Sequence, residues 1–168
     1  MKDMDGSILR VYSNGEINYT LKGVHARVKV TWNYAAPEGT GDTHYSMMRG
    51  SRCQLEIKQG EREGYQPTLY IIPTAIDSPV QFHRDLDSAF QQVEAKYPGI
   101  SFSGIDEFTW RVDIPENFKV GHEAHFGQVT ENFLDYISGG TLPDWEIPNM
   151  IVKYYTTTEA LKQAFDMK

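Results

Sequence analysis

The chain is 168 residues long and acidic, with 16 Lys and Arg residues against 23 Asp and Glu residues and a formal net charge of −7. Its basic residues are scattered and form no patch that could hold a phosphate backbone, so we expect no nucleic-acid partner. No apolar run approaches the roughly 20 residues of a membrane span, so we expect no membrane partner and a soluble protein. The length predicts a single domain over residues 1–168.

Strand patterns dominate the first seventy residues. Asn14-Gly15 is a strong signal for a two-residue hairpin turn, and it separates predicted strands at residues 8–13 and 16–21. Residues 24–34 are apolar at every even position and polar or charged at every odd one. This period of two predicts one long strand with a buried face and a polar face.

Three more strands are predicted downstream, at residues 43–48, 52–58 and 68–72. Sequential strands with short connections pair antiparallel, because parallel pairing needs a long crossover. Cys53 alternates with Leu55 and Ile57, which places it on the apolar face of its strand as a free, buried cysteine. As the single cysteine of the chain, it excludes an internal disulfide and a cysteine-rich metal site.

A helical period replaces the strand pattern at Ser78-Pro79, which supplies an N-cap and a proline at the first helical position. Apolar residues then follow at spacings of three and four, at Phe82, Leu86, Phe90, Val93 and Tyr97. Pro98-Gly99 ends this helix. Residues 102–114 return to strand alternation, and two further helices are expected, at residues 121–138 and from residue 148 onward.

Strands and helices are thus segregated along the chain, which is typical of the α+β class. We expect an open-faced, mainly antiparallel β-sheet with helices packed on one face. The polar positions of the long strand would then form an uncovered or partner-facing surface. Its residues are His25, Arg27, Lys29, Thr31 and Asn33.

Motifs for catalysis or cofactor binding are scarce. Gly39-Thr40-Gly41 has two glycines but no helix after it, so it does not predict a phosphate-binding turn. His44 shares a strand face with Ser46 and Met48 and is the best candidate for lining a pocket, together with Arg49 nearby. His122 and His125 lie three residues apart on a helix but lack a third metal ligand at a recognised spacing, so no metal site is predicted.

Two segments carry a resemblance to a known family. Residues 41–57 resemble the strand–turn–strand in which Gfo/Idh/MocA-type oxidoreductases carry G-T-x-G-x-L-x-I, with the turn at residues 49–52. Residues 125–143 resemble the penultimate helix of that family, which ends F-L-x-x-I-x-x-G-x-x-P. More narrowly, the whole chain resembles the C-terminal domain of Bacteroides-type oxidoreductases of this family.

The resemblance implies a two-domain protein. An N-terminal Rossmann domain would bind NAD(P) and carry the glycine turn and the catalytic lysine, none of which is in this chain. The C-terminal domain would line the substrate pocket and build a homo-oligomer through its open sheet face. No catalytic or cofactor-binding residue can therefore be carried over to this sequence, and the compartment depends on the part not seen here.

Three readings follow from these observations. The first is the non-catalytic C-terminal part of an NAD(P)-dependent oxidoreductase that acts on a sugar or polyol-like substrate. The second is a stand-alone binding or assembly module without redox activity. The third is a small enzyme in its own right, using His44 with Arg49, or the pair His122 and His125.

Overall fold

The computed structural model describes residues 4–9, 13–32, 34–74 and 78–166. It divides into two compact units, Met1–Ala35 with Thr130–Lys168, and Ala36–Val129. We call the first the hairpin unit and the second the sheet unit. Helices and antiparallel sheets occupy separate stretches of the chain, so the α+β prediction is confirmed.

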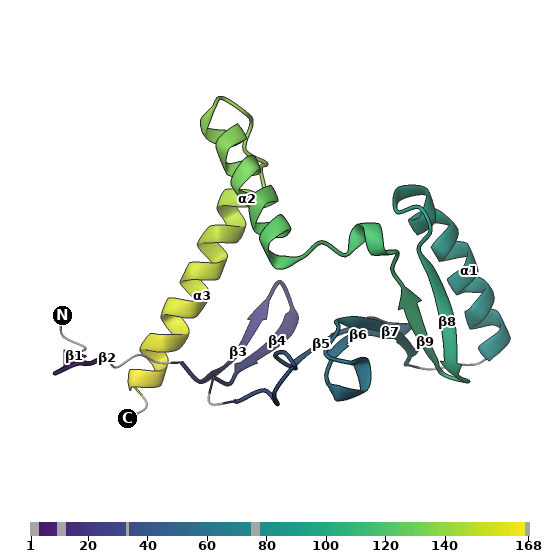
Figure 1. The fold of residues 1–168 in the computed structure, drawn as a ribbon, viewed down its shortest axis with the longest axis horizontal. Coiled ribbons are helices and arrows are strands. Elements are labelled where there is room, and N and C mark those ends of the chain that lie inside the picture. Colours follow the sequence, from purple (N-terminus) through teal and green to yellow (C-terminus); the bar gives the residue numbers. More distant parts are fainter. Residues whose placement is uncertain (1–3, 10–12, 33, 75–77, 167–168) are drawn as a thin grey trace. The chain divides into compact units, whose positions relative to one another are not determined.

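The sheet unit contains a five-stranded sheet in which every pair of neighbours is antiparallel (Figure 1). The strand order is β5-β6-β7-β9-β8. The strands are β5 (His44–Arg49), β6 (Cys53–Gln59), β7 (Thr68–Pro73), β8 (Ser101–Asp106) and β9 (Thr109–Asp113). Two short 3-10 helices, η1 (Glu61–Glu63) and η2 (Glu116–Phe118), follow β6 and β9.

Helix α1 (Pro79–Lys96) covers one face of this sheet, as its apolar stripe predicts. The Ser78 hydroxyl accepts a hydrogen bond from the backbone N–H of Gln81 at 3.3 Å, which confirms the expected N-cap. Leu86 is buried in a core cluster with Ile71, Trp110 and Val112. Partly buried side chains complete the cluster, namely Cys53, Leu69, Phe82, Phe90, Ile100 and Phe102.

The prediction of one strand over residues 102–114 is wrong, because the segment folds into two strands, β8 and β9. The Asp106 side chain accepts a hydrogen bond from the backbone N–H of Phe108 at 2.8 Å, which stabilises a turn between them. Phe108 continues the apolar alternation of Trp110 and Val112, so the sequence pattern hides the turn. Trp110 and Val112 are buried as expected, whereas Phe108 is exposed.

The hairpin unit contains an antiparallel ribbon of β3 (Gly15–Leu21) and β4 (Val24–Val30), apart from the five-stranded sheet. Leu21 pairs with Val24, so Lys22 and Gly23 form a two-residue turn, and both have positive φ angles, 49° and 79°. This is the geometry of a type I′ hairpin turn. A shorter ribbon joins β1 (Met4–Asp5) to β2 (Ile8–Leu9).

The predicted turn at Asn14-Gly15 is wrong, since Gly15 is the first residue of β3 and pairs with Val30. The Asn14 side chain instead accepts a hydrogen bond from the backbone N–H of Trp32 at 2.6 Å, closing the open end of the ribbon. Strand β4 ends at Val30, so it is shorter than the predicted strand 24–34. Residues 10–12 of the predicted strand 8–13 lie outside the described residues.

Two helices follow the five-stranded sheet along the chain, α2 (His122–Ile137) and α3 (Glu146–Asp166). The division between the two units falls within α2. Helix α3 packs beside the β3–β4 ribbon, and the hollow between them is lined by Ile17, Tyr19, Val28, Asn149, Val152, Lys153, Thr156 and Thr157. The predicted stripe of α3, which includes Ile151, Tyr155 and Leu161, is exposed.

Candidate functional site

Strand register assigns the side chains of the five-stranded sheet to its two faces. Paired residues in antiparallel strands project to the same side. Leu55, Ile71 and Trp110 form one cross-strand row, and since Ile71 and Trp110 pack with Leu86, this row faces α1. The next row contains Glu56, Tyr70 and Arg111 and therefore projects to the opposite face, which we call the outer sheet face.

Glu56 is the buried charged residue of the described part of the chain, with 7% of its surface exposed. Its Oε1 atom accepts hydrogen bonds from the Tyr45 hydroxyl and the Gln54 side-chain amide, each at 3.1 Å. Its Oε2 atom lies 2.7 Å from Lys58 Nζ. We call these four residues, with Tyr70, the Glu56 cluster.

Burial of a carboxylate is costly unless its oxygen atoms are bonded. The central strand position of Glu56 removes it from water, and the three donors replace its lost hydration. Its carboxylate raises the pKa of Lys58 through their hydrogen bond, so the lysine stays charged. The cluster is a satisfied ionic network on an ordered sheet, which makes it a rigid polar surface.

The two tyrosines of the cluster are hydrogen-bond donors. Desolvation, followed by the hydrogen bond to Glu56, raises the pKa of Tyr45. Desolvation also raises the pKa of Tyr70, with the charge of Glu63 and a 3.3 Å hydrogen bond to its Oε1 atom adding to the effect. Lys58 Nζ lies 5.3 Å from the centroid of the Tyr70 ring. Protonated hydroxyls and a paired lysine suit the binding of polar groups rather than nucleophilic attack.

The structure does not bring His44 and Arg49 together. Their strand positions differ by an odd number, so they project to opposite faces of β5. Arg49 pairs with Gln54 and therefore lies on the outer sheet face beside the Glu56 cluster. His44 lies on the other face, where its Nε2 atom shares a 3.1 Å hydrogen bond with the Ser46 hydroxyl, in agreement with the predicted shared face.

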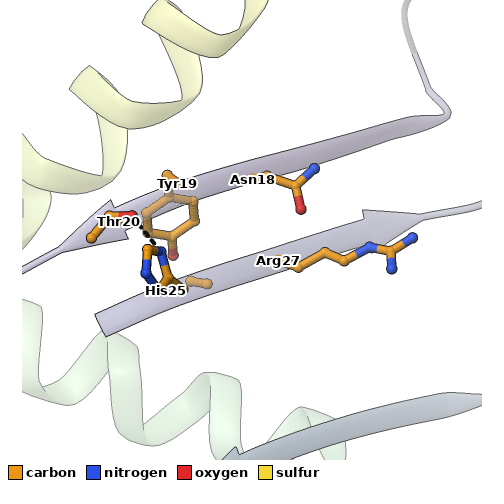
Figure 2. A pocket seen from close by; sticks show the side chains of 6 residues that line it. Asn18, Tyr19, Thr20, His25 and Arg27 are labelled. Carbon is orange, nitrogen blue, oxygen red and sulfur yellow. Dashed lines mark hydrogen bonds between the residues drawn. The ribbon is translucent and has the colours of Figure 1, made fainter. Parts of the chain in front are cut away.

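The hairpin unit carries a second polar surface, an open hollow on the β3–β4 ribbon (Figure 2). Figure 2 shows the bond between Thr20 Oγ1 and His25 Nδ1, which are 2.7 Å apart. Arg27 projects from β4, the strand that also carries His25, and forms an ion pair with Glu16 of β3 at 2.9 Å. The hydrogen bond from Arg27 lowers the pKa of Glu16, and the side chains of Arg27 and Glu16 are 65% and 37% exposed.

These residues include part of the predicted interface. His25, Arg27 and Lys29 alternate along β4 and share its polar face, as expected. Thr31 lies beyond the end of β4, and Asn33 lies outside the described residues. The polar face therefore belongs to the two-stranded ribbon rather than to the five-stranded sheet.

The sequence reasoning missed the Glu56 cluster. A signal was present, because Gln54, Glu56 and Lys58 alternate with the apolar residues of β6, which marks a polar face. The pattern could not show that the central carboxylate is buried. Its burial depends on Tyr45 and Tyr70, which come from the two neighbouring strands.

A dinucleotide site needs a glycine turn between a parallel strand and the N-terminus of a helix. Gly39 and Gly41 instead precede strand β5, and the strand pairs within the described residues are all antiparallel. These residues therefore do not fit the pyrophosphate of NAD(P). Among the residues with described structure, no cluster of three metal-ligating side chains occurs and no helix is long and apolar enough to span a membrane.

The architecture defines an α+β domain with ordered polar faces, and comparisons with known proteins identify its family. The chain belongs to the family described as "Putative oxidoreductase C terminal domain", whose model matches residues 1–165. It is similar to a crystal structure of a putative oxidoreductase from Parabacteroides merdae ATCC 43184, with 49% sequence identity and a TM-score of 0.89. That match covers 99% of this chain and 38% of the relative's chain. A comparison with curated proteins finds no match.

Proposed function

We propose that this chain is the C-terminal domain of an NAD(P)-dependent oxidoreductase of the Gfo/Idh/MocA type that acts on a sugar or polyol-like substrate. The observation that carries the proposal is the family match over residues 1–165, in a chain that spans 38% of the length of its relative. On this account an N-terminal Rossmann domain binds the nucleotide and supplies the catalytic groups. The present chain contributes binding surfaces and is inactive alone.

The residues of the outer sheet face support a substrate-binding role for this chain, with the catalytic groups on the other domain. A polyol offers hydroxyl groups that both donate and accept hydrogen bonds. Tyr45, whose proton is donated to Glu56, could accept from them, whereas Lys58 and Arg49 could donate to them. The Glu56 carboxylate holds the first two in position without taking part in chemistry. We therefore propose Arg49 as a substrate contact on this face, and His44 as a separate contact on the face of α1.

The polar face of the β3–β4 ribbon is the proposed homo-oligomer surface, through His25, Arg27, Lys29, Thr31 and Asn33. Charged and hydrogen-bonding side chains along a ribbon fit the polar rim of an interface better than its apolar centre. The same feature favours a second candidate function, a stand-alone assembly module without redox activity. The two candidates differ in whether a nucleotide-binding domain precedes this chain.

Calorimetric titration with NAD and NADP separates them. We expect the 168-residue chain to bind neither nucleotide and the longer protein to bind at least one at micromolar concentration. A longer protein that binds neither would contradict the oxidoreductase proposal and leave the assembly module. Micromolar binding by the 168-residue chain alone would contradict the assignment of the nucleotide site to another domain.

A further inference from the structure

The two tyrosines of the Glu56 cluster each donate their hydroxyl proton to a carboxylate. Tyr45 donates to Glu56 Oε1 at 3.1 Å, and Tyr70 donates to Glu63 Oε1 at 3.3 Å. A phenol has a single proton to donate and keeps lone pairs with which to accept. Toward a ligand on the outer sheet face, both tyrosine oxygen atoms therefore act as hydrogen-bond acceptors.

Lys58 supplies a donor between these two acceptors. It lies on β6, whose neighbours β5 and β7 carry Tyr45 and Tyr70. It pairs with Tyr45 in the sheet register, and its Nζ atom lies 5.3 Å from the centroid of the Tyr70 ring. Its contact with Glu56 uses one of its three N–H groups, and 40% of the side chain is exposed. The order across the three strands is thus acceptor, donor, acceptor.

The loop around η1 holds Glu63 in place. The backbone N–H groups of Glu63 and Tyr65 both donate to the carbonyl oxygen of Gly60, at 3.1 Å and 2.8 Å. Tyr65 has a φ angle of 59°, in the left-handed region that residues with a side chain seldom adopt. Strain of this kind persists where the surrounding structure enforces it, and it is concentrated at functional sites. The loop therefore fixes the carboxylate that takes the Tyr70 proton.

We propose that Tyr45, Lys58 and Tyr70 recognise neighbouring hydroxyl groups of a polyol, with the two tyrosines accepting hydrogen bonds and the lysine donating one. Glu63 is a positioning residue, because it holds the Tyr70 proton and so makes that oxygen an acceptor. This inference rests on the proposed function and adds to it the hydrogen-bond polarity of the site. A ligand with a fluorine, ether or keto group in place of a donating hydroxyl brings lone pairs against lone pairs and binds more weakly.

Deoxyfluoro analogues test the proposal, because fluorine is close to a hydroxyl group in size and cannot donate a hydrogen bond. The probes are glucitol, xylitol and myo-inositol, each with analogues that carry one fluorine at one position. Fluorine NMR gives the dissociation constants of the analogues, and competition gives those of the polyols, for the 168-residue chain and for the longer protein. We expect one polyol to bind roughly ten-fold more tightly than two of its analogues, one for each tyrosine.

Substitutions assign these two preferences to their residues. Tyr70→Phe should reduce one of them to within about two-fold, and Tyr45→Phe the other, because the accepting oxygen is then absent for both ligands. Glu63→Ala leaves the Tyr70 proton free to turn toward the ligand, so it should remove the same preference as Tyr70→Phe. The affinity of Glu63→Ala for the polyol should stay within about three-fold, whereas a structural role alone would weaken the binding of both ligands together. Tyr97→Phe, at the C-terminal end of α1, is the matched control and should keep both preferences.

Three results would overturn the proposal. The first is that both preferences persist in Tyr70→Phe, or, if that variant does not fold, in Tyr45→Phe. The second is that Glu63→Ala keeps the preference that Tyr70→Phe removes. The third is equal affinity for the polyols and all their analogues, or no binding of any polyol at about 0.1 M by either protein.

The nucleotide titration of the longer protein distinguishes this inference from the proposed function. Both preferences in a longer protein that binds neither NAD nor NADP would support the inference and contradict the oxidoreductase function. Nucleotide binding, together with polyol affinities that none of the substitutions changes, would refute the inference and leave the function standing.

Discussion

The ion pair between Glu56 and Lys58 provides the sharpest test of the outer sheet face. Replacing Lys58 with Met removes the charged donor 2.7 Å from Oε2 and leaves the buried carboxylate with two neutral donors. A hydrogen bond to a buried charge contributes about 1.5–3 kcal/mol. Because 40% of the Lys58 side chain is exposed, we discount this to about 1–2 kcal/mol of unfolding free energy.

A double-mutant cycle isolates that interaction. Glu56→Gln keeps an acceptor for Tyr45 and Gln54 but removes the charge, so Lys58→Met should cost less in its presence. We expect urea denaturation to give a coupling energy of about 1 kcal/mol between the two substitutions. Additivity within about 0.3 kcal/mol would show that the pair is solvated and that the Glu56 cluster is not a rigid network.

Two further predictions concern stability. The hydrogen bond from Arg52 lowers the pKa of Asp85 below its ordinary value of 3.8, with a second bond from Gln81. The ionised carboxylate therefore stabilises the fold above about pH 4, and this contribution is lost as the pH falls through the lowered pKa. In an acid titration, the unfolding free energy of Asp85→Asn should fall less steeply with pH than that of the parent. The same pH dependence in both proteins would contradict this assignment. Gly140→Ala should destabilise the chain by about 1–3 kcal/mol in urea, because its Cβ would lie 2.6 Å from the backbone oxygen of Asp135. Gly127→Ala is the matched control, because a Cβ at this position in helix α2 meets nothing within 4 Å. The control should be neutral or slightly stabilising. Equal losses of stability for the two variants would refute the steric argument.

The sequence predicted helix α1 closely because its boundaries and its buried face are local properties. Ser78, Pro79 and the Pro98-Gly99 stop define its ends, and the spacing of Phe82 and Leu86 defines the face that meets the sheet. The fold class followed from the same kind of information. Strand alternation and helical periodicity are each visible within a single segment.

Turns and pairing were harder to predict because they depend on residues that are distant in the chain. Asn14-Gly15 is a strong turn signal in the sequence, but the hairpin turn lies at Lys22-Gly23. There the paired strands place both turn residues at positive φ. The Asp106 turn was hidden because Phe108 continues the apolar alternation. The opposite faces of His44 and Arg49, by contrast, follow from the period of a single strand and could have been read from the sequence.

The Glu56 cluster shows the same limitation at the site. Polar alternation in β6 marks a polar face, but three strands must pair before Tyr45, Glu56 and Tyr70 come together. Burial of the carboxylate is a consequence of that pairing.

Turnover by the longer protein tests the central proposal most directly, namely that this chain is the non-catalytic part of an oxidoreductase. The assay follows NAD(P)H absorbance with a panel of sugars and polyols, for the longer protein and for the 168-residue chain in parallel. We predict substrate-dependent reduction of the nucleotide by the longer protein and none by the chain alone. Reduction catalysed by the 168-residue chain would contradict the account.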